Sequence, residues 1–164
     1  MTRTVKQLFD LTGQTALVTG GSRGLGLQMA HALGEAGARL MLSSRKADDL
    51  QEAVAELKAA GIEADYIAAD CGKEEDIRRL AQETVKKMGR IDILVNNAGA
   101  TWGAAAEVHP VSAWDKVMNL NVRGYFILAQ EVANLSMIPN GRGRILNVAS
   151  IAGLAGNPPE MQTI

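Results

Sequence analysis

The sequence is poor in the residues that build disulfides and metal sites. Cys71 is the only cysteine among the 164 residues, which excludes an internal disulfide and a metal cluster made of cysteines. The two histidines, His31 and His109, are far apart and lack the spacing of metal ligands. We therefore expect no metal site.

A charge excess and a long apolar run are also lacking. Seventeen Lys and Arg stand against eighteen Asp and Glu, and both signs are scattered, whereas a nucleic-acid-binding protein needs a clustered basic face. No apolar run approaches the roughly 18 residues of a membrane span. The first nine residues hold no stretch long enough for a secretory signal. These absences predict a soluble, cytoplasmic protein without nucleic-acid or membrane partners.

The remaining composition, 47% hydrophobic and 21% charged, is that of a globular protein, and its length favours a single domain over 1–164. Short apolar runs typical of buried strands alternate with helical spacing. The expected strands are 15–19, 39–43, 62–69, 91–95 and 144–148, and the expected helices are 25–35, 46–60, 73–88 and 111–137. Gly124 is a point where the last helix bends or is interrupted. This alternation predicts an α/β fold, a Rossmann-like doubly wound parallel sheet with helices on both faces.

Glycines cluster where the first strand meets the first helix, at Gly20, Gly24 and Gly26. Such a turn lets backbone N–H groups approach a phosphate at a helix N-terminus. The loop lacks the Gly-Lys-Ser/Thr ending of a P-loop, and its spacing differs from Gly-x-Gly-x-x-Gly. A tight turn without a ligand is the alternative, but the position after the first strand favours nucleotide binding.

Four motifs together resemble the short-chain dehydrogenase/reductase family. The segment 19–26 resembles its Thr-Gly-x-x-x-Gly-x-Gly signature, and 96–99 resembles its Asn-Asn-Ala-Gly motif. The segments 121–124 and 147–153 resemble its mid-helix asparagine and its catalytic-serine segment. The resemblance implies the strand order 3-2-1-4-5. Segments 101–104 and 157–163 look most like 3-oxoacyl thioester reductases and gluconate 5-dehydrogenase-like members.

The end of the second strand indicates the cofactor. An acid there would accept a hydrogen bond from a ribose 2′-hydroxyl and repel a 2′-phosphate, but residues 43–46 read Ser-Ser-Arg-Lys. Arg45 can fork onto a phosphate, and Arg23 can reach the same group. We therefore expect NADP rather than NAD. The alternative is that Arg45 and Lys46 lie on a solvated helix start.

The resemblance implies a wider cofactor site. Its residues would be Gly20, Ser22, Arg23, Gly24, Leu25, Gly26, Ser44, Arg45, Asp70, Cys71, Asn97, Ala98 and Gly99. Asp70 would bind the adenine amino group, with a helix cap as the alternative, and Cys71 would line the same pocket. Cys71 is a poor candidate nucleophile because nothing near it in sequence lowers a thiol pKa. Asn96 is expected to hold neighbouring strands together.

Reduction of a carbonyl needs a proton donor and a group that polarises the carbonyl. The resemblance assigns the polarising role to Ser150 and a water-holding role to Asn121. Asn119 is the competitor of Asn121, and a turn-forming role is the alternative for Ser150. Trp102 either borders the mouth of the active site or has no special role, and Trp114 is expected in the core or an interface.

The family's Tyr-x-x-x-Lys pair is absent from the 164 residues. Tyr66 and Tyr125 are the only tyrosines, and neither is followed by lysine at the fourth position. The leading hypothesis is an NADP-dependent oxidoreductase acting on a small ketone or secondary alcohol, forming a homotetramer or homodimer through the long helix when full length. The resemblance implies that the domain is incomplete and that its C-terminal part is missing, so we expect this piece alone to be inactive. The alternative is a nucleotide-binding or interaction module that lacks the proton donor.

Overall fold

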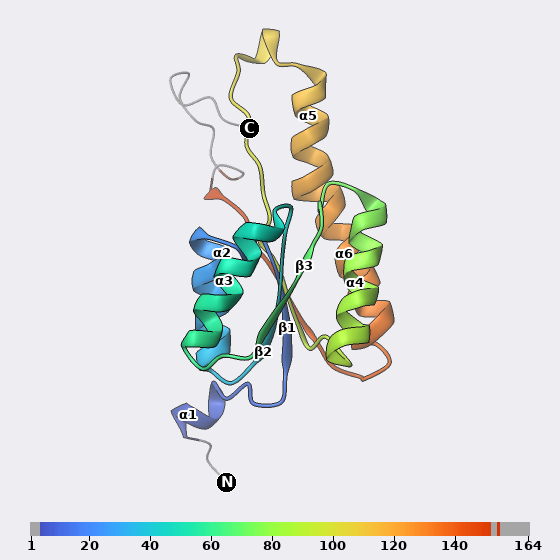
Figure 1. Cartoon of the computed structure of the whole chain (residues 1–164). Helices are drawn as coiled ribbons and strands as arrows, with labels where there is room; N and C mark the ends of the chain where they lie inside the picture. Colours follow the sequence, from blue (N-terminus) through green and yellow to red (C-terminus); the bar gives the residue numbers. More distant parts are fainter. Residues whose placement is uncertain (1–3, 152–153, 155–164) are drawn as a thin grey trace.

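A computed structural model describes residues 4–151 and 154. Its centre is a parallel five-stranded sheet with the order β3-β2-β1-β4-β5, as expected (Figure 1). The strands are β1 (Thr15–Thr19), β2 (Arg39–Ser44), β3 (Ala64–Ala68), β4 (Ile93–Asn96) and β5 (Arg144–Asn147). The third and fourth strands are shorter than the apolar runs that predict them, because the flanking apolar residues pack in the connections.

Two layers of helices cover the sheet. On one face lie α2 (Gly24–Glu35) and α3 (Ala47–Ala59), and on the other lie α4 (Glu74–Met88) and α6 (Tyr125–Val132) (Figure 1). Leu17 of β1 packs into the core on the α4 side, and Val18 packs into the core on the α2 side. Both faces of β1 are therefore buried, which explains its apolar run without alternation.

The long helix expected over 111–137 is interrupted twice. It consists of α5 (Val111–Met118), a π-helical stretch η2 (Asn119–Gly124), α6, and a second π-helical stretch η3 (Ala133–Met137). The first interruption ends at Gly124, where a Cβ would lie 2.2 Å from the carbonyl oxygen of Cys71. Glycine is required there because the helix passes directly against the backbone of another loop.

Two short helices were not among the expected elements. The first, α1 (Val5–Leu8), has a capping box in which Thr4 and Gln7 exchange side-chain to backbone hydrogen bonds. The Thr-x-x-Gln spacing was a sequence signal for it. The second, η1 (Ala106–Val108), is a 3-10 turn in the loop before α5. Within the described part of the chain, no helix has the length and apolarity that crossing a membrane requires.

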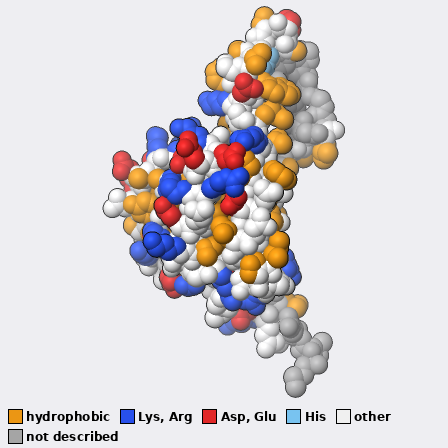
Figure 2. All heavy atoms as spheres, turned by 90° about the vertical axis from the view of Figure 1, so that its right-hand side faces the viewer, with side chains coloured by type: hydrophobic (Ala, Val, Ile, Leu, Met, Phe, Trp, Pro, Cys, Tyr) orange, Lys and Arg blue, Asp and Glu red, His pale blue; other side chains and the backbone are white. Residues whose placement is uncertain are grey.

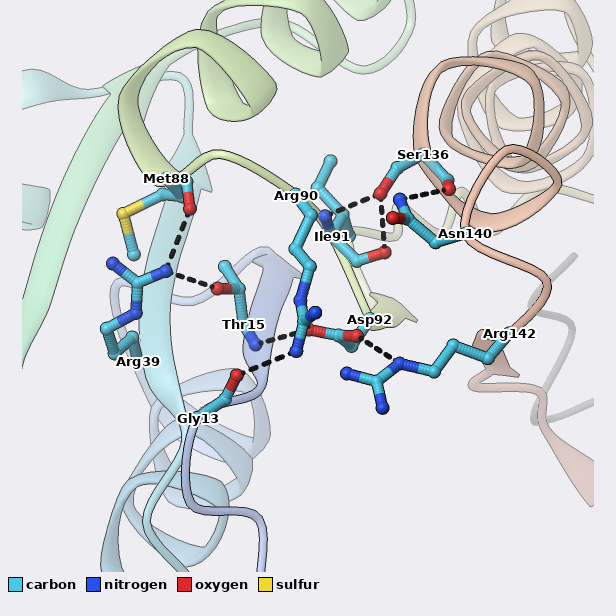
Figure 3. Close-up of polar contacts among 10 residues, drawn as sticks. All are labelled: Gly13, Thr15, Arg39, Met88, Arg90, Ile91, Asp92, Ser136, Asn140 and Arg142. Carbon is cyan, nitrogen blue, oxygen red and sulfur yellow. Dashed lines mark hydrogen bonds and ion pairs between the residues drawn. The ribbon is translucent and has the colours of Figure 1, made fainter.

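A buried carboxylate fixes the start of β4 at the amino edge of the sheet (Figure 3). Asp92 is 4% exposed, and its Oδ2 accepts hydrogen bonds from Thr15 N at 3.0 Å and Arg90 Nε at 2.8 Å. Its Oδ1 lies 3.3 Å from Nε of Arg142, in the connection that leads to β5. Asp92 therefore joins β1, β4 and the β5 connection at the end of the sheet opposite the glycine loop.

A second contact at this edge comes from η3. The buried Ser136 hydroxyl accepts a hydrogen bond from Ile91 N at 2.8 Å and donates one to Ile91 O at 3.0 Å. Asn140 Nδ2 in turn donates to Ser136 O (Figure 3). The second π-helical stretch is thus tied to the residues just before β4.

Candidate nucleotide-binding and active site

A cleft of about 930 Å³ runs along the carboxyl ends of the strands. Segments that follow β1, β2, β3 and β4 line it, together with the α5–η2 junction. The carboxyl edge is where open α/β sheets bind their ligands. Of the residues expected to bind a cofactor, those that line the cleft are Gly20, Ser22, Arg23, Gly24, Ser44, Arg45, Asp70, Cys71, Asn97, Ala98 and Gly99.

Leu25 and Gly26 do not line the cleft, although they were included in the expected site. Gly26 lies under the loop, and a Cβ there would be 2.1 Å from the carbonyl oxygen of Gly20. Gly26 therefore lets the first turn of α2 pack against the loop. Gly24 has a φ of +56° and nothing within 4 Å of its Cβ direction, so its backbone borders open space.

The glycine loop is held against the loop that follows β4. The Thr19 hydroxyl accepts hydrogen bonds from Asn97 N at 3.0 Å and Ala98 N at 3.1 Å, and it donates to Val95 O. Asn97 Nδ2 donates to Thr19 O at 3.0 Å and more weakly to Gly20 O at 3.4 Å. Sequence reasoning placed Asn97 at the nucleoside but missed this bracing role, which requires the two loops to be side by side.

Asn96 holds neighbouring elements together, as expected. Its Nδ2 donates to Asn147 Oδ1 at 2.9 Å, across the β4–β5 pair, and also lies 3.4 Å from the carbonyl oxygen of Tyr125. The paired strands place the residues after β5 beside those after β4.

Positive charge gathers at the β2 end of the cleft. Arg45 and Lys46 follow β2, and Arg23, in the glycine loop, lines the same cleft. These three side chains form no ion pair with another described residue. Asp49, in the first turn of α3, is the one acid on this side of the cleft, and sequence reasoning missed it. The fork of Arg45 suits a phosphate, because guanidinium groups bind phosphate oxygens in pairs.

Asp70 does not cap the helix that follows it. The N-cap position of α4 is Lys73, which makes no side-chain cap bond, whereas Asp70 Oδ1 accepts from Gly72 N at 3.0 Å. Asp70 N donates to Asp76 Oδ2 at 2.9 Å, and this bond, with Arg79, holds the pKa of Asp76 below its ordinary value. Asp76 thus fixes the backbone of Asp70 beside the cleft.

Cys71 is an unreactive thiol in this setting. Its side chain is 6% exposed, and burial, reinforced by Asp70 and Asp76, raises the pKa of the thiol to about 12. A nucleophilic cysteine needs the opposite shift, toward the thiolate at neutral pH. Cys71 therefore serves as a wall of the cleft.

The two expected catalytic residues lie outside the lining of this cleft. Asn121, in η2, uses both side-chain groups on one neighbour: Oδ1 accepts from Ala100 N at 3.0 Å and Nδ2 donates to Ala100 O at 2.8 Å. Its competitor Asn119 lines the cleft instead. Ser150 is exposed and follows β5, whose end is held to β4 by the bond from Val148 N to Asn96 O.

Neither tyrosine, Tyr66 or Tyr125, follows Ser150 in the sequence as the family's tyrosine follows its serine. Tyr66 is in β3, and Tyr125 is half-buried at the start of α6, where burial raises its pKa. Among the described residues, no group of three or more His, Cys, Asp or Glu is arranged to hold a metal.

One feature of the cleft was not expected from the sequence. Lys116 of α5 lines it, and its Nζ lies 5.5 Å from the centre of the Trp102 ring. Trp102 is 41% exposed and belongs to the loop after β4. Trp114, expected in a core or an interface, is half exposed, so it does not belong to the core of the described chain.

Comparison with known proteins agrees with the fold and the motifs. The model of the family described as short chain dehydrogenase matches residues 14–161. A rhamnolipid-biosynthesis 3-oxoacyl-[acyl-carrier-protein] reductase of Pseudomonas aeruginosa is 45% identical over 150 residues, which are 90% of this chain and 58% of the relative. Gluconate 5-dehydrogenase of Gluconobacter oxydans is 38% identical, over 92% of this chain and 59% of its own length. The chain thus spans less than two thirds of these relatives.

Solved structures give the same relationship. The Pseudomonas aeruginosa RhlG/NADP active-site complex matches with a TM-score of 0.83 and 43% identity, over 92% of this chain and 59% of that one. A gluconate 5-dehydrogenase from Burkholderia cenocepacia, in complex with NADP and tartrate, matches with a TM-score of 0.89 and 33% identity, over 95% and 61%. Taken with the glycine loop, the Asn-Asn-Ala-Gly segment and the sheet order, these matches establish that the chain belongs to the short-chain dehydrogenase family.

Proposed function

We propose that this chain is the nucleotide-binding part of an NADP-dependent oxidoreductase that interconverts a ketone and a secondary alcohol. The observation that carries the proposal is that Arg45, after β2, and Arg23, in the glycine loop, line the same cleft. A 2′-phosphate gains from two cations there, whereas the 2′-hydroxyl of NAD gains most from an acid. The NADP complexes among the related structures support this choice.

The residues of the cleft fit such a cofactor. The open backbone at Gly24 and the N-terminus of α2 would receive the pyrophosphate. Asp70, which lines the cleft, would accept a hydrogen bond from the adenine amino group. Asn97, Ala98 and Gly99 would face the ribose, with Asn97 also bracing the glycine loop.

In the proposed reaction, NADPH supplies a hydride to the carbonyl carbon, a proton goes to the oxygen, and NADP⁺ and an alcohol result. Ser150 would donate a hydrogen bond to the carbonyl oxygen. Asn121 would act by holding Ala100, because both of its side-chain groups are used there. The proton requires a donor such as the family's Tyr-x-x-x-Lys pair, which these 164 residues do not contain.

That missing pair favours a second candidate for the 164 residues taken alone, namely a module that binds the nucleotide without turnover. For the complete enzyme, the names of the relatives support a 3-oxoacyl thioester or a keto-sugar acid as the substrate. The exposed apolar face of α5 and α6 supports assembly into homodimers or homotetramers. The single cysteine, a buried free thiol, agrees with the reducing cytoplasm as the compartment.

Titration calorimetry with NADP⁺ and NAD⁺ tests the proposal. We expect NADP⁺ to bind at least about tenfold more tightly, and Arg45→Ser to remove most of that preference. The matched control is Arg144→Ser, which removes an arginine at the amino edge of the sheet, away from the cleft. Equal affinity for the two nucleotides in the unmodified protein would refute NADP dependence. Binding without NADPH oxidation on 3-oxoacyl or keto-acid substrates would favour the non-catalytic module.

A further inference from the structure

Lys116 is a cation that lines the cleft but is not part of the proposed nucleotide site. Arg23 and Arg45, the cations proposed to bind the 2′-phosphate, line the cleft after β1 and after β2. Lys116 belongs to α5, which follows β4 and stands above α6, on the side of the molecule away from α3 (Figure 1). Its ammonium lies over the ring of Trp102, in the loop that follows β4, so Lys116 is on the β4 side of the cleft, which Ala100 of the same loop also lines.

The ammonium of Lys116 lies over an aromatic ring and has no counter-ion among the described residues. Trp102 offers the face of its ring at 5.5 Å, an arrangement that holds a cation without neutralising it. Among the described residues no carboxylate lies within ion-pair distance of Lys116. The two acids that line the cleft, Asp49 and Asp70, follow β2 and β3, on the other side of β1.

The loop that carries Trp102 is itself held in place. Asn121 clamps Ala100 with two hydrogen bonds, two residues before Trp102, so the segment after α5 is bonded directly to the loop that carries the ring. An exposed cation that is held over an aromatic ring at the rim of a cleft is suited to bind an anionic group of a ligand.

We propose that Lys116, positioned by Trp102, recognises a negatively charged group of the substrate, remote from its reacting carbonyl. This inference rests on the proposed function and adds a requirement to it, that the substrate be an anion. A sugar-acid carboxylate and the phosphate of a phosphopantetheine thioester share this chemistry, and the test separates them.

The test compares kcat/KM of the complete enzyme for paired substrates with and without the anionic group. One pair is 5-ketogluconate and its methyl ester, and the other is acetoacetyl-phosphopantetheine and its neutral N-acetylcysteamine counterpart. We expect Lys116→Met to lower the ratio of kcat/KM for the anionic over the neutral member about tenfold in the pair that resembles the true substrate, mainly through KM. Lys116→Arg should restore the ratio, because Arg also stacks on an aromatic ring.

Controls distinguish this role from a general defect. Lys86→Met removes an exposed lysine of α4 away from the cleft and should leave the ratio unchanged. Trp102→Leu should lower the ratio less than Lys116→Met does, because the cation remains but is no longer held. An equal loss on both members of each pair, or a weaker Kd for NADPH in place of a changed ratio, would overturn the inference.

A binding measurement keeps the inference separate from the proposed function. If the complete enzyme reduces none of these carbonyl compounds, the proposed reaction fails. Gluconate and phosphopantetheine are then titrated into the protein saturated with NADP⁺. The inference survives if one of them binds and Lys116→Met weakens its Kd about tenfold, and it falls if neither binds or the variant binds equally well.

Discussion

Asn97 and Asn121 both use their side-chain amides to hold the backbone of a neighbouring loop. Asn97 holds the glycine loop through Thr19 O, and Asn121 holds Ala100 through two hydrogen bonds. A buried backbone group that loses such a partner costs about 1–3 kcal/mol, so these asparagines shape the cleft before any ligand arrives. The two asparagines therefore fix the geometry of the loops that they hold.

The Cys71 thiol should resist alkylation in the folded protein. Burial raises its pKa from 9.0 to about 12, so the folded protein holds almost no thiolate at pH 8 or at pH 10. Because the folded pKa is the higher one, burial of the thiol costs no stability below pH 9 and destabilises the fold as the pH rises from 9 toward 12. Iodoacetamide labelling followed by mass spectrometry should be slow in buffer and fast in urea at the same pH; rapid labelling in buffer would contradict the prediction.

Gly26→Ala should abolish nucleotide binding. The new methyl group would lie 2.1 Å from the carbonyl oxygen of Gly20, a backbone atom that can move only if the loop is displaced. We expect a loss of about 1–3 kcal/mol in the free energy of unfolding and no measurable NADP⁺ binding by calorimetry.

Gly34→Ala, in the last turn of the same helix, is the matched control. Its methyl group would collide with the Ile62 side chain at 2.3 Å, far from the cleft. It should also lower the stability, but it should keep the affinity for NADP⁺. Loss of binding in both variants would mean that α2 as a whole, and not the loop contact, is responsible.

At the scale of elements, β1, β2 and β4 could be predicted from their apolar runs because both faces of the sheet are covered there. The interruptions of the long helix could not be placed so well. Gly124 marked the first one, but its physical cause is the approach of the Cys71 carbonyl, a contact between segments more than fifty residues apart. The second interruption, at Ala133–Met137, is fixed by the bonds of Ser136 to Ile91, which helical spacing does not reveal.

Asp92 should stabilise the amino edge of the sheet more through one backbone hydrogen bond than through its ion pairs. Arg90 and Arg142 are partly exposed, so each pair contributes at most about 1 kcal/mol, whereas an unsatisfied Thr15 N–H costs about 1–3 kcal/mol. We expect Asp92→Ala to lower the free energy of unfolding by about 2–4 kcal/mol and Asp92→Asn, which keeps an acceptor, by about 1 kcal/mol. Urea denaturation measures both.

Asp115→Ala provides the comparison for this series, because Asp115 is exposed on α5 and forms no ion pair with a described residue. It should change the stability by less than about 0.5 kcal/mol. If Asp92→Asn proved as damaging as Asp92→Ala, the charge rather than the hydrogen bond would be the main contribution.

At the scale of the whole molecule, apolar side chains are exposed along one side. Hydrophobic groups run down the projecting part of the molecule where α5 lies, and Phe126 of α6 is 65% exposed (Figure 2). All four residues of β5 are exposed too, and within the described chain β5 pairs only with β4. Contiguous apolar surface of this kind favours association.

Phe126→Glu should therefore weaken self-association. A carboxylate in an apolar contact between copies loses hydration without gaining a partner. In sedimentation-velocity runs over a range of concentrations, we expect this variant to shift toward the monomer. Phe9→Glu is the control, because Phe9 is 71% exposed beside α1 at the opposite end of the molecule. A monomeric unmodified protein, or an equal effect of the two variants, would contradict a role for α6 in assembly.

The sequence predicts most of the residues that line the cleft, but not those that the interrupted helix brings to it. The glycine loop, Arg45, Asp70 and the residues after β4 come together as expected because each follows the carboxyl end of a strand. Lys116 could not be predicted because no sequence motif contains it. The path of the interrupted helix and the contact with Trp102 bring it to the cleft. Ser150 was placed correctly after β5.

The contact between Gly124 and the Cys71 carbonyl joins η2 to a wall of the cleft without an intervening side chain. Backbone against backbone leaves no rotamer that could absorb a small displacement, so the two segments must shift together. Occupation of the adenine side, at Asp70 and Cys71, should then slow deuterium uptake by the amides of η2, which carries Asn121. The loaded nucleotide would in this way set the stiffness of the π-helical stretch beside the cleft.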